Sequence, residues 1–146
     1  MLIGLPSILG PELLYALRAM GHGDEIAIVD GNYPAQEHAR RLVRADGHGI
    51  LVVLDAVLQV LPLDTATPIA IFRASLQGNT ARRAAIHEQI EQTCHLRQPG
   101  FAVEPLSAAA LYPRIRNAHT VVATSEPQLF ANVILRKGAI SLPTST

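Results

Sequence analysis

The sequence contains a single cysteine and few charged side chains for its 146 residues. Because Cys94 has no second cysteine to pair with, a disulfide within the chain is excluded, which suits a reducing compartment. Charged residues make up 16% of the chain, below the roughly 25% that is usual in soluble domains. Since nearly half of the residues are apolar, we expect other subunits of a homo-oligomer to cover part of the surface.

Neither sign of charge is in excess: twelve basic and twelve acidic residues give a formal net charge of zero. A nucleic-acid partner usually requires a basic excess or a basic stripe, so we expect none. The one dense cationic cluster, Arg40, Arg41 and Arg44, is interpreted as a solvated face or as an ion-pair site between subunits.

Long hydrophobic runs are missing as well. The longest, residues 50–54, is far too short to span a bilayer. The first residues lack the basic region and apolar stretch that are typical of a signal peptide. From these two observations we expect a cytoplasmic protein with no membrane partner.

The sequence lacks the signatures of nucleotide and metal binding. It has no Gly-x-x-x-x-Gly-Lys-[Ser/Thr], and no Gly-x-Gly-x-x-Gly that opens a helix after the first strand. Its histidines are scattered without the spacing of a zinc site; they are His22, His38, His48, His87, His95 and His119. We therefore expect no metal and no cofactor. His87 and His95 are interpreted as solvated residues on the polar face of a helix, and Cys94 as a small buried or half-buried side chain.

The hydrophobic pattern predicts an α/β domain in which helices alternate with short, wholly apolar strands. Helices are expected over residues 11–20, 49–61, 80–96 and 107–118. Buried strands are expected over residues 26–29, 121–124 and 133–135, and further strands over residues 68–74 and 103–106. Residues 36–43 are of mixed polarity, which is compatible with both a helix and a loop. No repeat or linker divides the chain, which indicates one domain.

The segment Met20–Glu25, Met-Gly-His-Gly-Asp-Glu, says most about function. Its glycines free the backbone and clear space around the imidazole of His22, and histidine exchanges protons near neutral pH. After the apolar run that follows, Asp30 is placed to orient this imidazole or to grip a hydroxyl group. The alternative is a turn histidine that only makes local hydrogen bonds.

Four separate segments, in this order along the chain, carry a resemblance: Leu9–Leu14, Met20–Pro34, Arg44–Gly47 and Phe130–Gly138. Together they resemble the D-ribose pyranase/L-fucose mutarotase family (RbsD/FucU), over residues 2–140. The resemblance implies a single three-layer α/β domain of the RbsD-like type over residues 1–140, with a short-stranded sheet flanked by helices. A polar tail follows at residues 141–146. It also implies a closed homo-oligomer, a decamer of two five-membered rings.

The resemblance further implies a monosaccharide substrate and a set of site residues. The residue matching His22 is the acid/base group, with the residue matching Asp30 beside it. A tyrosine and an asparagine of the closing segment complete the family's site. Asn132 is retained here, whereas Phe130 stands where the family has its tyrosine. A phenyl ring can stack on the apolar face of a sugar, but it cannot transfer a proton.

Mutarotation of a sugar is compatible with this small inventory. A base removes the proton of the anomeric hydroxyl while an acid protonates the ring oxygen, and the opened ring closes again as the other anomer. General acid–base catalysis of this kind contributes roughly 10²–10⁴-fold for each positioned group. No cofactor, metal or covalent nucleophile is needed.

The choice between the two branches of the family depends on a few positions. Residues 20–25 and 44–47 are closer to the fucose branch. The ribose branch usually carries a histidine three positions before the aromatic residue matched by Tyr112, and that position is Ala109 here. L-Fucose or a related 6-deoxyhexose is therefore the expected substrate.

Four further side chains are candidates for contact with the sugar. Tyr33 and Tyr112 are candidates to supply, from another part of the chain, the hydroxyl that Phe130 lacks. Arg73 and Gln77 lie in a segment that varies across the family, where they tune sugar choice or are simply solvated.

Other functions fit the same residues. The chain is also compatible with a non-catalytic sugar-binding or regulatory module that has lost its proton relay at Phe130. D-Ribose pyranase activity and an unrelated aldose isomerase on the same scaffold are the remaining alternatives.

Overall fold

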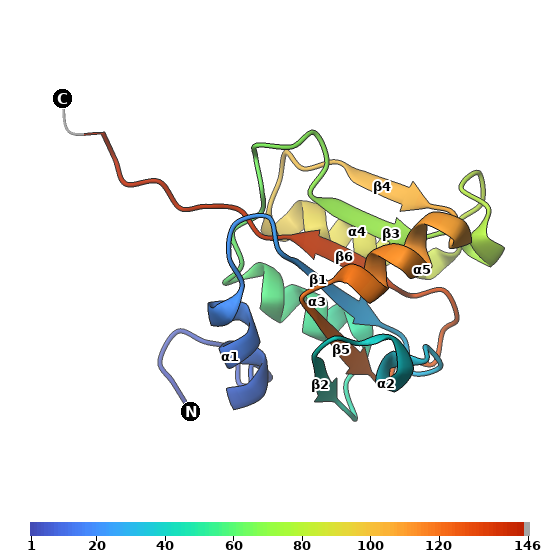
Figure 1. Cartoon of the computed structure of the whole chain (residues 1–146), viewed down its shortest axis with the longest axis horizontal. Helices are drawn as coiled ribbons and strands as arrows, with labels where there is room; N and C mark the ends of the chain where they lie inside the picture. The colour runs from blue at the N-terminus through green and yellow to red at the C-terminus, as the bar shows by residue number, and fades with distance from the viewer. Residues whose placement is uncertain (145–146) are drawn as a thin grey trace.

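Short segments of four or five residues pair into one six-stranded sheet, in the order β2–β5–β1–β6–β3–β4 (Figure 1). Strand β6 runs antiparallel to its neighbours β1 and β3, whereas the other strand pairs are parallel. The computed structural model describes residues 1–144. The strands are β1 (Glu25–Val29), β2 (Leu42–Ala45), β3 (Ile71–Ala74), β4 (Val103–Leu106), β5 (Thr120–Thr124) and β6 (Val133–Arg136).

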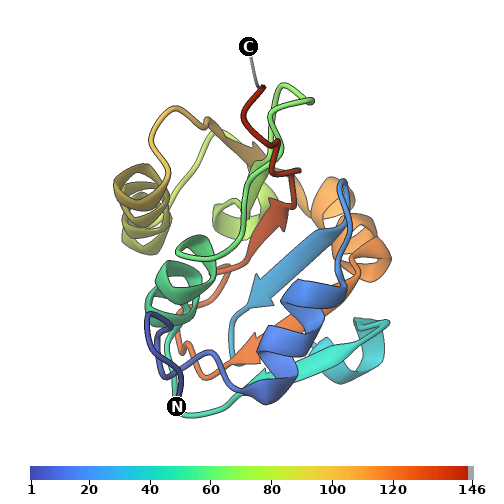
Figure 2. The same cartoon turned by 90° about the vertical axis from the view of Figure 1, so that its left-hand side faces the viewer.

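Helices cover both faces of this sheet. One face packs against α1, α3 and α4, and the other against α2 and α5; Figure 2 shows α3 and α4 on one side and α5 on the other. The helices are α1 (Pro11–Ala19), α2 (Ala35–His38), α3 (Ile50–Leu58), α4 (Ala85–Arg97) and α5 (Ala108–Asn117), with a short 3₁₀ turn η1 (Leu76–Gly78). The predicted three-layer α/β fold is confirmed.

Strand β1 explains why the core has two parts. Successive side chains of a strand point to opposite faces. Ile26 and Ile28 therefore enter the core beneath α1, α3 and α4, while Ala27 and Val29 enter the smaller core beneath α5. All four are 0% exposed, and a strand that is buried on both faces reads as a continuous apolar run.

Local signals set the helix ends. Helix α1 begins at Pro11 and carries Glu12 in its first turn and Arg18 in its last, which complements the helix dipole. Helix α5 begins after Ser107, whose hydroxyl oxygen accepts a hydrogen bond from the N–H of Ala110.

Two expected elements differ from the structure. The ambiguous segment 36–43 contains most of α2 and then the start of β2. Strand β2 is a half-exposed edge strand, so its alternation of burial is weak, and parallel pairing with β5 organises it. The helix expected from residue 80 begins only at Ala85.

The topology creates two distinct edges of the sheet. The parallel strands all end at one edge, which we call the carboxyl edge, and β6 begins there. At the opposite edge, the amino edge, β1 begins and β6 ends. No helix in the described part of the chain is long and apolar enough to cross a membrane. Residues 141–144 contain no helix or strand.

Candidate active site

At the carboxyl edge, Asp30 and Asn132 are held together. The side-chain oxygen of Asn132 accepts a hydrogen bond from the backbone N–H of Asp30 at 3.0 Å. Both residues are 5% exposed. The Asp30 carboxylate accepts the N–H of Asn32 at 2.9 Å, yet burial raises the pKa of this carboxyl above its ordinary value. Two polar side chains that are distant in sequence thus meet at the end of β1.

A cavity of about 290 Å³ opens beside Asn132, and Asp30 is absent from its lining. Phe130, Asn132 and Tyr112 all line it, together with Gln77 of the η1 turn. Its size lies near the lower limit of small-molecule sites, roughly 300–1,000 Å³, so one compact ligand fills it. The structure therefore brings together Asn132 with three of the residues that were expected to serve a sugar.

Phe130, which lines the cavity, has an unusual backbone conformation. Its φ is 61°, a left-handed conformation that non-glycine residues seldom adopt. The carbonyl oxygen of Phe130 accepts a hydrogen bond from Nε2 of His87 at 2.8 Å, and Nδ1 of His87 accepts the N–H of Ala84 at 2.9 Å. Helix α4 thereby fixes the loop that carries Phe130.

The interpretation of His87 as a solvated residue is wrong. Its side chain is 0% exposed, and burial lowers the pKa of its imidazole. The neutral ring has one donor and one acceptor nitrogen, and each is used, by the carbonyl of Phe130 and the N–H of Ala84 respectively. Cys94, four residues after Ile90 on the same buried face of α4, is 1% exposed as expected.

Arg73 is also buried, so a solvated role for it is excluded. It is 4% exposed, its Nε donates to Glu91 at 2.7 Å, and its Nη1 donates to the carbonyl of Ala74 at 2.9 Å. Arg73 is absent from the lining of the cavity, whereas Ala74 belongs to it. Within one chain, Arg73 stabilises the strand beside the cavity.

His22 lies at the amino edge, in the turn before β1. Its side chain is 51% exposed, and its Nε2 lies 2.9 Å from Oδ1 of Asp64. Asp64 is 2% exposed and also accepts hydrogen bonds from Nε of Arg136 at 2.8 Å and from the N–H of Ala66 at 2.9 Å. Asp64, and not Asp30 of the same chain, orients this imidazole.

The charge of Asp64 is strongly stabilised. Hydrogen bonding from Arg136, then from the Ala66 N–H and from His22, lowers the pKa of the Asp64 carboxyl far below its ordinary value. The carboxylate is therefore ionised under ordinary conditions. Sequence reasoning missed Asp64, because it lies 42 residues after His22 in a loop with no recognisable motif.

The candidate site is divided into two halves, His22 with Asp64 at the amino edge and Asp30 with Asn132 at the carboxyl edge. Within one chain, the length of β1 separates them. That strand has five residues, which at about 3.3 Å per residue amount to about 16 Å. His22 precedes the strand at the amino edge, and Asp30 follows it at the carboxyl edge. A single chain thus does not bring His22 to the cavity that holds Asn132.

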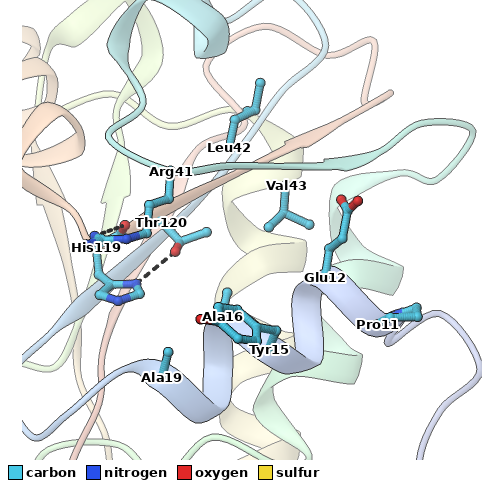
Figure 3. A pocket seen from close by; sticks show the side chains of 10 residues that line it. All are labelled: Pro11, Glu12, Tyr15, Ala16, Ala19, Arg41, Leu42, Val43, His119 and Thr120. Carbon is cyan, nitrogen blue, oxygen red and sulfur yellow. Dashed lines mark hydrogen bonds between the residues drawn. The ribbon is translucent and has the colours of Figure 1, made fainter.

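A larger cavity lies elsewhere, between α1 and the edge strand β2 (Figure 3). It has a volume of about 780 Å³, and its polar lining consists of Glu12, Tyr15, Arg41, His119 and Thr120. Nδ1 of His119 lies 2.8 Å from the hydroxyl oxygen of Thr120. None of the site residues expected from the sequence lines this groove.

Within residues 1–144, no three side chains of His, Cys, Asp or Glu are grouped so that they could hold a metal ion.

Comparison with known proteins identifies the family to which this fold belongs. Residues 3–140 match the model of the RbsD / FucU transport protein family. The match covers almost the whole chain, so the protein belongs to this family.

Several relatives within the family are named as fucose mutarotases. The chain is 41% identical to the fucose mutarotase of Homo sapiens, over 95% of this chain and 94% of that protein. It is 33% identical to the L-fucose mutarotase of Glaesserella parasuis, over 99% of both. A crystal structure of the fucose mutarotase from Streptococcus pneumoniae in complex with L-fucose matches with a TM-score of 0.87 and 34% identity, covering 96% of this chain and all of that one.

Proposed function

We propose that this protein is a mutarotase that interconverts the α and β anomers of L-fucose or a closely related 6-deoxyhexose. The observation that carries the proposal is full-length similarity to fucose mutarotases at 33–41% identity, joined to a cavity in which Asn132 and Phe130 lie side by side. The reaction uses general acid–base catalysis and needs no cofactor.

The cavity suits a sugar with one apolar face. Phe130 presents an aromatic ring, on which the C–H face of a pyranose can stack. Asn132 offers hydrogen-bonding groups for its hydroxyls from the lining of the cavity, and the proposed hydroxyl contact of Asp30 comes from outside that lining. Because both polar residues are 5% exposed, their positions are fixed by the fold before any ligand enters.

His22 is the general acid/base. The ionised Asp64 fixes the orientation of its imidazole, as a carboxylate does for many catalytic histidines. One proton leaves the anomeric hydroxyl while another reaches the ring oxygen, and the bond between the anomeric carbon and the ring oxygen breaks. Closure of the open-chain aldehyde on its other face returns both protons and gives the other anomer.

The separation of the two halves supports a site between subunits. We propose a homo-oligomer, a decamer of two five-membered rings, in which His22 of one subunit reaches the carboxyl edge of its neighbour. Large apolar side chains near the N-terminus are solvent-exposed in the single chain, Leu2 by 64% and Ile3 by 105%. Such exposure is typical of surfaces that contact a partner.

We also place the protein in the cytoplasm. The single cysteine, Cys94, is buried and unpaired, which suits a reducing compartment.

Saturation-transfer NMR of L-fucose tests the proposal. The wild-type protein should accelerate anomer exchange above the buffer rate, and His22→Ala should remove the effect. The matched control is His48→Ala, because His48 is another exposed histidine in a glycine-flanked turn. An exchange rate that His22→Ala leaves unchanged would contradict the mechanism.

The same spectra separate the alternative functions. Binding of L-fucose without faster exchange would indicate a sugar-binding module. Faster exchange of D-ribose than of L-fucose would indicate a pyranase, and the appearance of a ketose would indicate an aldose isomerase.

A further inference from the structure

Tyr112 is the phenol that lies at the cavity. It lines the cavity beside Phe130 and Asn132, and it is 43% exposed. Phe130 has no hydroxyl, so a proton donor at this edge must come from another residue. The question is what holds a half-exposed tyrosine in a defined place.

Two aromatic rings pack directly on Tyr112. The ring of Tyr33 stacks on it, with centroids 5.8 Å apart and planes inclined by 19°. The ring of His38 meets it edge-on, at 6.0 Å and 83°. Tyr33 and His38 also contact each other edge-on at 5.2 Å, so the three rings form a closed cluster. Such aromatic contacts have geometric preferences that restrict ring rotation.

A chain of hydrogen bonds fixes this cluster. The hydroxyl oxygen of Tyr33 lies 2.7 Å from Nδ1 of His38. On the other side of the imidazole, Nη2 of Arg116 lies 2.9 Å from Nε2 of His38. Arg116 stands four residues after Tyr112 on helix α5, about one helical turn away. The chain of contacts therefore starts and ends on the same helix.

The donor and acceptor roles along this chain follow from Arg116. A guanidinium can only donate hydrogen bonds, so Nε2 of His38 is the acceptor, and the neutral ring carries its hydrogen on Nδ1. This N–H donates to the hydroxyl oxygen of Tyr33. Burial, and then the charge of Arg116, lowers the pKa of His38, which favours the neutral ring. Burial raises the pKa of Tyr33 to about 12, so the phenol stays protonated.

We propose that Tyr33, His38 and Arg116 are positioning residues that hold Tyr112 so that its hydroxyl serves the sugar in place of the one that Phe130 lacks. This inference rests on the proposed mutarotase function. In ring opening, Tyr112 gives its proton to the ring oxygen as that oxygen leaves the anomeric carbon, and His22 takes the proton of the anomeric hydroxyl. In ring closure, the proton on the former ring oxygen returns to Tyr112.

The first test is Tyr33→Phe, which keeps the stacked ring and removes the hydroxyl that His38 binds. We expect kcat for L-fucose exchange to fall about 5-fold, the effect of one lost hydrogen bond, with KM unchanged because Tyr33 does not line the cavity. The matched control is Tyr15→Phe: Tyr15 lies on α1 in the separate groove and is 77% exposed, so kcat should not change. Arg116→Met interrupts the same chain at its other end and should lower kcat similarly.

The second test asks whether Tyr33→Phe lowers kcat because it disturbs the hydroxyl of Tyr112. In a Phe130→Tyr background the cavity has its own hydroxyl, so adding Tyr33→Phe should cost clearly less than it does in the wild type. An equal loss in both backgrounds, or the same kcat for Tyr33→Phe and Tyr15→Phe, would overturn the inference. If the wild type exchanges L-fucose and His22→Ala abolishes this, such a result leaves the proposed function standing. A wild type that exchanges no sugar would overturn both.

Discussion

The two edges of the sheet are built in opposite ways. At the amino edge, charged groups are paired and partly open to solvent: His22 is 51% exposed and Asp64 binds both His22 and Arg136. Glu25 extends this network to Arg114 at 2.7 Å. At the carboxyl edge, Asp30 and Asn132 are each 5% exposed and share a hydrogen bond beside a small cavity.

This contrast shows what each half can do alone. The amino edge has an accessible proton-transfer group, but the cavity that holds Asn132 and Phe130 lies at the other end of β1. The carboxyl edge has recognition groups already desolvated by the fold, yet its own His22 cannot reach them. A division of this kind makes sense when a second chain joins the halves, because each subunit then offers one half at each of two edges.

The largest predicted effects are those of Asn132→Ala and His22→Ala, which should both lower exchange strongly but differ in their effect on stability. Asn132→Ala leaves the buried N–H of Asp30 without its partner, which costs about 1–3 kcal/mol in the free energy of unfolding. Misplacing Asp30 should also lower exchange by about 10²-fold. His22→Ala should lower exchange at least as much but change stability much less, since the side chain is half exposed and Asp64 keeps its hydrogen bonds from Arg136 and Ala66. Urea unfolding beside NMR exchange measures both effects. Equal loss of stability in the two variants would contradict the contrast.

The next largest effect is expected for Asp64→Asn, which removes the charge that orients His22. We expect exchange to fall by about 10- to 100-fold, a part of what one positioned acid/base group contributes. Stability should change with a defined pH dependence. The pKa of Asp64 is lowered by folding from 3.8, so its stabilising contribution is present above pH 3.8 and is lost as the pH falls through its folded value.

The difference in unfolding free energy between wild type and Asp64→Asn should thus be constant near neutral pH and shrink below pH 3.8. Urea titrations at fixed protein concentration measure it. A difference that grows on acidification would refute the ionised Asp64.

A smaller effect is predicted for His87→Asn, which tests the support behind the carboxyl edge. Asparagine is too short to serve both Ala84 and the carbonyl of Phe130, so the unmet groups should cost about 1–3 kcal/mol. The cavity wall should loosen, and KM for L-fucose should rise a few-fold while kcat changes little. His95→Asn is the matched control, because His95 is an exposed histidine on the same helix. Similar melting temperatures for both variants would argue against the role assigned to His87.

The smallest change is expected for Phe130→Tyr. If Tyr112 supplies the needed hydroxyl only in part, a second phenol should raise kcat by about 2- to 5-fold without altering the oligomer. NMR exchange and light scattering check this. Lower activity would mean that Phe130 belongs to a differently specialised sugar site, which would weaken the assignment of L-fucose.

The sequence predicted most of the fold because buried strands and amphipathic helices carry their own patterns. Residues 26–29 and 133–135 are apolar runs that lie within β1 and β6. Strand β2 escaped prediction because it is a half-exposed edge strand, organised by its pairing with β5. Local pattern carries no information about such pairing.

The candidate site was predictable only where a motif marks it. His22, Asp30 and Asn132 lie in segments that resemble the family. Asp64 and His87 do not, and their partners are 42 and 43 residues away. A helical pattern also cannot show that a polar side chain such as His87 is buried, because the carbonyl that satisfies it belongs to a distant loop.

The central claim is that His22 of one chain acts with Asn132 of another. Mixed oligomers test this claim most directly. His22→Ala and Asn132→Ala are each expected to be nearly inactive. When the two variants are co-expressed with different tags and purified through both, random assembly in equal amounts gives about a quarter of the sites with both native halves. The account predicts that L-fucose exchange recovers to about a quarter of the wild-type rate. Pairing Asp30→Asn with Asn132→Ala, two changes in the same half, should recover nothing. No recovery in the first mixture, or equal recovery in both, would contradict a site shared between chains.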